Sequence, residues 1–131
     1  GLGERLNYDD IKLSIKPSII QGTTYLGMIA NFDKPFLNPN LTLDQFGELV
    51  QKDTKELRDF FELYLFTNFT DEMNRLRVQF ARNLIKHGCM KKACLKNLHL
   101  ESGFSTSNDL DFYFLEFEGL TIQGFIQSIT K

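Results

Sequence analysis

Residues 110–119 read Leu-Asp-Phe-Tyr-Phe-Leu-Glu-Phe-Glu-Gly, and this stretch decides the fold that the sequence predicts. Its aromatic residues favour a β-strand, and Glu118-Gly119 is typical of a tight turn. We therefore expect a strand over residues 110–117 and a returning strand over residues 120–129. Apolar side chains occur at both odd and even positions of the first strand, so both of its faces should lose contact with water.

The two faces of this predicted strand have different expected roles. We expect Leu110, Phe112 and Phe114 to lie in the core on one face. The opposite face should bind another protein or a second copy of the chain as a homodimer, because exposed aromatic patches mark interfaces. Its partner-binding residues are Tyr113, Leu115 and Phe117. Two other interpretations are a central strand covered by the rest of the chain and a strand that lines a ligand cavity.

Two helices are expected upstream of these strands. Thr42 and Gln45 have the spacing of a capping box, and the apolar residues that follow have a helical period over residues 42–66. A second helix should begin at Thr70, with acidic residues in its first turn, and end near Gly88. The short break between them favours a helical hairpin.

The remaining strands complete an α+β fold. Alternating apolar residues predict strands at residues 11–15 and 25–32, and residues 94–101 should add another. The order β-β-α-α-β-β-β indicates one two-layer domain over residues 1–131, with an antiparallel sheet packed against the helical hairpin. Residues 1–7 are expected to be flexible.

The composition excludes several classes of protein. The chain has 131 residues, 42% of them apolar, and a net charge of −2, which is ordinary for a globular domain. No stretch has the roughly 18–20 apolar residues of a membrane span. A glycine-rich phosphate loop and the common hydrolase signatures are missing, and only two histidines are present. We therefore expect a non-enzymatic interaction or assembly domain without a cofactor.

A basic segment gives an alternative function. Residues 73–100 carry seven cations and no acidic residue, whereas the other 103 residues have a net charge of −9. Such asymmetry can create a local positive field that binds nucleic acid or another polyanion. Phe80 is the one aromatic residue in the segment, so nucleic acid is not the favoured partner. The simpler interpretation is a solvated helix face. The candidate polyanion-binding residues are Arg75, Arg82, Lys86, Lys91, Lys92 and Lys96.

Two charged residues interrupt the apolar faces of the predicted helices. Asp53 falls inside the apolar sector of helix 42–66, and Arg77 falls inside that of the following helix. A buried charge needs a partner or a water-filled cleft, so these residues could form a polar pocket, the site of a small enzyme. The alternative is a pair of positions at the helix rim, with Arg77 reaching solvent.

The two cysteines lie between the two histidines. The side chains of His87, Cys89, Cys94 and His99 are of the types that zinc prefers, but the usual Cys-x2-Cys spacing is missing, so we expect no metal. Two unpaired thiols in a reducing compartment such as the cytoplasm are favoured over a disulfide in an oxidising one. A nucleophilic Cys94 has little support, because no orienting group is visible.

Overall fold

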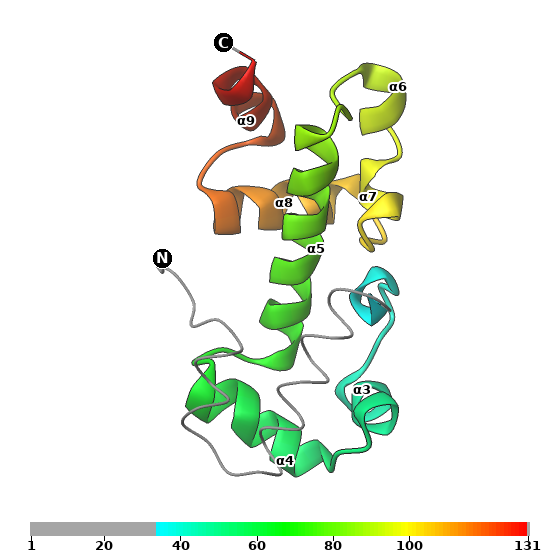
Figure 1. Cartoon of the computed structure of the whole chain (residues 1–131), viewed down its shortest axis with the longest axis vertical. Helices are drawn as coiled ribbons and strands as arrows, with labels where there is room; N and C mark the ends of the chain where they lie inside the picture. Colours follow the sequence, from blue (N-terminus) through cyan, green and yellow to red (C-terminus); the bar gives the residue numbers. More distant parts are fainter. Residues whose placement is uncertain (1–33, 131) are drawn as a thin grey trace. The chain divides into compact units, whose positions relative to one another are not determined.

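The computed structural model describes residues 34–130, and every regular element in this part of the chain is helical (Figure 1). The predicted α+β fold with an antiparallel sheet is therefore wrong for residues 34–130, which contain no strand. The strands predicted at residues 11–15 and 25–32 and the segment 1–7 lie outside the described residues.

The described residues divide into two compact units. The first contains residues 34–35 and 40–72, and the second contains residues 36–39 and 73–130. The prediction of a single domain stays a prediction, and each unit is described by itself.

The first unit begins with helix α3 (Leu43–Val50). Thr42 accepts a hydrogen bond from the backbone N–H of Gln45 across 3.1 Å, and the Gln45 side chain accepts one from the backbone N–H of Thr42 across 3.0 Å. The capping box predicted from the sequence is therefore confirmed.

The single helix predicted over residues 42–66 is wrong, because the chain turns after Val50. Gln51 adopts the left-handed conformation, with φ +56°, and the N–H of Lys52 donates to the carbonyl of Gly47 across 2.9 Å. This is the hydrogen bond of a Schellman motif, which ends a helix. Helix α4 (Thr54–Asp59) and the π-helix η3 (Phe60–Tyr64) follow as separate elements.

Aromatic side chains form the core of the first unit. Phe46 of α3, Phe61 of η3 and Phe69 pack in a triangle with ring centroids 5.8–6.3 Å apart. Phe46 and Phe61 are fully buried. Tilted and edge-on ring contacts of this length add to the stabilisation from burial alone.

Helix α5 (Phe69–Lys86) carries the chain into the second unit. The helix predicted over residues 70–88 is confirmed within two residues at each end. Its cap differs from the prediction, because the Asn68 side chain accepts from the N–H of Asp71 across 2.8 Å, and Thr70 lies inside the helix. A 3-10 turn, η2 (Pro35–Leu37), contributes Phe36 and Leu37 to this unit.

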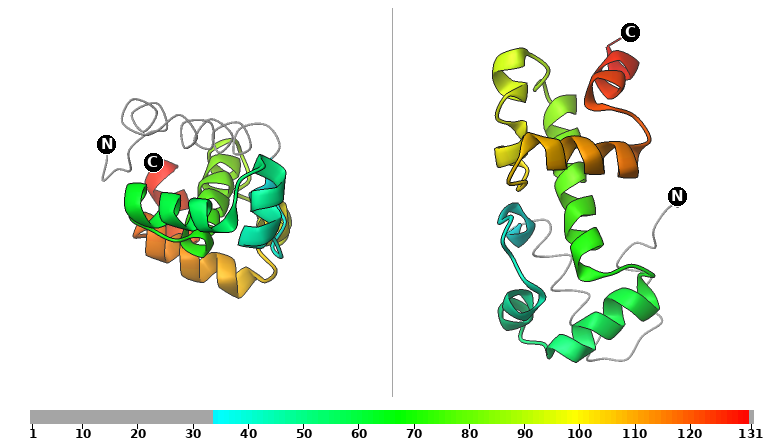
Figure 2. Two further views of the ribbon diagram at one scale, coloured as in Figure 1. Left: turned by 90° about the horizontal axis from the view of Figure 1, so that it is seen from below. Right: turned by 180° about the vertical axis from the view of Figure 1, so that it is seen from behind.

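Helices occupy all three segments predicted as strands in the last third of the chain. Residues 94–101 contribute to α6 (Lys92–Leu95) and α7 (Leu98–Glu101), and the other two form α8 (Ser107–Glu118) and α9 (Ile122–Ile129). Thr106 and Thr121 cap α8 and α9, and Gly119 ends α8 with φ +77°. In Figures 1 and 2, α8 crosses α5 within this unit.

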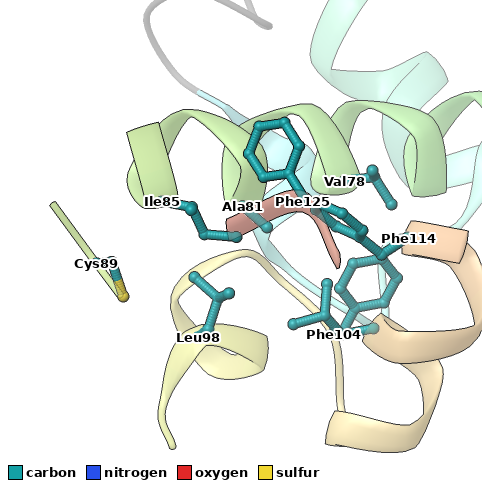
Figure 3. Packing of buried hydrophobic residues seen from close by; sticks show 9 residues of the cluster. Val78, Ala81, Ile85, Cys89, Leu98, Phe104, Phe114 and Phe125 are labelled. Carbon is teal, nitrogen blue, oxygen red and sulfur yellow. The ribbon is translucent and has the colours of Figure 1, made fainter. Parts of the chain in front are cut away.

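The core of the second unit lies where these helices meet. Phe114 of α8 packs with Phe125 of α9 and with residues of α5 and α7 (Figure 3). Leu110 of α8 belongs to the same cluster. The rings of Phe114 and Phe125 meet edge-on, with centroids 5.7 Å apart. The remaining buried members of this cluster are Val78, Ala81, Ile85, Cys89, Leu98 and Phe104.

Candidate functional site

The basic segment is built around the end of α5. The chain leaves this helix at Gly88, which has φ +117°, and the N–H of Cys89 donates to the carbonyl of Leu84 across 2.9 Å. A left-handed glycine at this position is typical of a helix end. Lys86 lies in the last helical turn, where the partial negative charge of the helix end favours a cation.

A disulfide closes the turn that follows. Cys89 and Cys94 are joined, with their Cα atoms 5.4 Å apart, and the described residues contain no free cysteine. Cys89 is buried in the core, whereas Cys94 is exposed on α6. The disulfide therefore anchors an exposed turn to the core beside Ile85 and Leu98. The interpretation as two unpaired thiols is wrong, and a nucleophilic Cys94 has no thiol to use.

Four lysines of this segment are exposed, and we call them the lysine cluster: Lys86, Lys91, Lys92 and Lys96. Lys91 is the residue before α6, Lys92 is its first residue, and Lys96 follows its last residue. The four lie within eleven residues of sequence, with Lys91 and Lys92 inside the loop closed by the disulfide and Lys86 and Lys96 on either side of it. Ammonium groups at such positions remain hydrated and accessible to an anionic partner.

The two arginines predicted to share this surface have other surroundings. Arg82 pairs with Glu118 across 2.9 Å, and its guanidinium carbon lies 5.2 Å from the ring centroid of Phe125. It thereby links α5 to α8 and α9. Arg75 is half-buried and already has an interaction partner.

Arg77 is buried in the second unit. Its Nε donates to the carbonyl of Phe36 across 2.6 Å, and its other nitrogens donate to Asn74 and to the carbonyl of Asn38. Burial lowers the pKa of Arg77, and an interaction with Tyr113 opposes this shift. Arg77 thus ties residues 36–39 to α5 and does not reach solvent.

Asp53 has a different environment from the one its helical position predicts. It is exposed and lies in the first unit, at the start of α4, where its side chain forms no capping hydrogen bond. The break after Val50 removes Asp53 from the apolar sector on which the pocket hypothesis depended.

The predicted aromatic sheet face does not exist in the described chain, because Tyr113, Leu115 and Phe117 belong to helix α8. Residues two apart in a helix point in very different directions. Tyr113 is half-buried and stacks on Phe104 and Phe117, with centroids 6.0 and 6.2 Å away, whereas Leu115 is 49% exposed. The prediction that the protein binds a partner through an aromatic sheet face is therefore wrong.

A pocket in the second unit was missed by the sequence reasoning. It is lined by parts of α6, α7, α8 and α9, and His99 and Asp111 are among its polar residues. The sequence did contain a signal for it, because Thr106 and Thr121 are residues that commonly begin helices. They would have predicted the starts of the two helices that line the pocket.

Metal and membrane sites were also sought over residues 34–130. No group of three or more histidine, cysteine and acidic side chains there could hold a metal ion. No helix in that range combines the length and the apolar character that a membrane span requires. Compared with protein-family models, curated proteins and solved structures, the chain matches none.

Proposed function

We propose that the protein binds a linear polyanion through the lysine cluster and performs no chemical reaction on it. The observation that carries this proposal is the exposure of four lysines within eleven residues, two of them inside the disulfide-closed loop and one on each side of it, in a stretch of 28 residues that has no acidic side chain. Nearby positive charges raise the local concentration of an anionic polymer even on a protein with a net charge of −2.

The character of the cluster favours recognition by charge alone. Lysine acts as a hydrated point charge and lacks the planar fork with which arginine reads a phosphate or a guanine edge. Phe80, the one aromatic residue of the segment, lies on α5, so stacking on single-stranded bases has no support. We infer binding to repeated sulfate or phosphate groups without sequence specificity.

The disulfide favours one of the two sources of such groups. Disulfides persist in oxidising compartments and are rare in the cytoplasm. We therefore propose that the protein works outside the reducing cytoplasm. This differs from the reducing compartment that its low cysteine content favoured. Outside the cytoplasm, we propose a sulfated polysaccharide as the polyanion. Duplex DNA serves as the comparison ligand in the binding test.

The test measures salt-dependent binding of the whole chain to heparin and to duplex DNA. Four lysine contacts with duplex DNA predict a slope of about −3.6 in a plot of log K against log salt. We expect saturable binding to heparin, tighter than to DNA, that weakens steeply with salt. Neutralising Lys91→Gln with Lys92→Gln should remove about half of the slope.

A matched variant separates the cluster from net charge. Lys55→Gln with Arg58→Gln changes the net charge equally at two exposed positions of the first unit. It should leave heparin affinity unchanged at constant salt. Equal losses in the two double variants, or binding that survives neutralisation of all four lysines, would refute the proposal.

A further inference from the structure

The pocket of the second unit has the size and position of a small-molecule site. It has a volume of about 580 Å³ and is lined by residues of α6 and α7 and by the first turns of α8 and α9. Ligand pockets commonly have volumes of about 300–1,000 Å³ and lie between packed elements. None of its lining residues belongs to the lysine cluster, so the proposal below does not rest on polyanion binding.

The inner lining of the pocket is apolar. Leu98 and Leu110 are 1% and 2% exposed, and both belong to the core cluster of this unit. Leu95 and Ile122 are partly buried and pack against the same cluster. A ligand that enters between them would remove its own apolar surface from water against preformed walls.

The polar part of the described lining carries one negative charge. Asp111 is exposed on α8, and the described residues that line the pocket include no lysine, arginine or second carboxylate. His99 also lines the pocket, and its Nδ1 atom is buried without a hydrogen-bond partner among the residues that the structure describes.

We propose that this pocket binds a small organic amine. The apolar body of the amine lies against Leu98, Leu110 and Ile122, and its protonated amino group lies toward the Asp111 carboxylate. Charge complementarity selects this class, because a carboxylate ligand would meet Asp111 with no lining cation to offset the repulsion. A neutral alcohol of the same shape retains the apolar contacts and loses the ionic one.

The test titrates the whole chain with three probes of one shape: phenethylamine, phenethyl alcohol and 3-phenylpropionate. Binding is followed by chemical shifts of the backbone amides of the pocket residues. We expect saturable shifts at His99 and Ile122, with phenethylamine bound about tenfold more tightly than the alcohol and the carboxylate bound most weakly. No saturable shift with the amine at its solubility limit would overturn the proposal, as would tighter binding of the carboxylate.

Two variants of α8 locate the charge that selects the amine. Asp111→Asn should weaken phenethylamine binding about tenfold and leave the alcohol unaffected. Asp109→Asn makes the same charge change on the same helix at an exposed residue that does not line the pocket. It should bind the amine like the unaltered chain. Equal losses in both variants would show a long-range effect of net charge and would refute the assignment to Asp111.

Discussion

The guanidinium of Arg77 donates from Nε to the backbone carbonyl of Phe36 across 2.6 Å, and it fastens two segments that are about 40 residues apart in the sequence. The same guanidinium donates to Asn74 Oδ1 across 2.6 Å and to the carbonyl of Asn38 across 3.0 Å. Arg77 is 6% exposed, and burial lowers its pKa because the charged form loses contact with water. These hydrogen bonds offset that desolvation.

Replacing Arg77 by Met should lower the free energy of unfolding by about 3 kcal/mol, because the buried carbonyl of Phe36, the partly buried carbonyl of Asn38 and the side chain of Asn74 lose their donors. Arg77→Lys should lose most of the same amount, since one ammonium group cannot replace three donors held in a plane. Urea denaturation measures both losses. Lys92→Met, at an exposed position, should change stability by about 0.5 kcal/mol or less. Equal stability of the three variants would contradict the assigned role.

The helical assignment of α8 predicts opposite effects for two neighbouring phenylalanines. Phe114 is fully buried, so Phe114→Ala should reduce the free energy of unfolding by about 3–5 kcal/mol. Phe112 is 61% exposed, so Phe112→Ala should lower it by about 1 kcal/mol or less, mostly through the lost contact with the Tyr113 ring 5.0 Å away. A strand would have put both in the core. Equal and large losses of thermal stability would contradict the helix.

The helical spacing of apolar residues that defines α8 was present in the sequence, but other apolar residues between them obscured it. Leu110, Tyr113, Phe114 and Phe117 have the spacing i, i+3, i+4 and i+7 of one helix face. Phe112 and Leu115 lie off that face, and their apolar character made the segment resemble a two-faced strand. The core prediction was therefore correct for Leu110 and Phe114 and wrong for Phe112. The strand was predicted from the high density of aromatic residues, although the helical spacing of the apolar residues is the stronger signal of secondary structure.

Other features could not be predicted from local sequence. The end of α3 depends on Gln51 in a left-handed conformation that glycine or asparagine usually adopts, so the Gln residue gave no signal for a break. The basic segment was visible as composition, but the ion pair of Arg82 with Glu118 depends on helix packing. Thr42 was predictable because a capping box is a local pattern.

Gly103 should be the least replaceable of the described glycines with positive φ. It has φ +90°, and an added Cβ would lie 2.6 Å from the carbonyl oxygen of Phe36 and 2.7 Å from the Cα of Leu37. Gly103→Ala should therefore cost about 3 kcal/mol through backbone strain and overlap. Gly88 has φ +117°, and no atom of the described residues lies within 4 Å of the added Cβ, so Gly88→Ala isolates the conformational cost of about 1 kcal/mol. Melting temperatures that rank the two variants in the opposite order would contradict this packing.

The last prediction concerns the disulfide between Cys89 and Cys94, which closes a short loop next to the core. A cross-link over such a loop restricts the unfolded chain and should stabilise the fold by about 2 kcal/mol. Adding a reductant should lower the urea midpoint of the unaltered chain accordingly. The double variant Cys89→Ala with Cys94→Ala should already have a lowered midpoint that the reductant does not change, which separates loss of the bond from a general effect of the reagent. A midpoint of the unaltered chain that is indifferent to the reductant, with free thiols confirmed by alkylation, would show that the bond does not stabilise this unit.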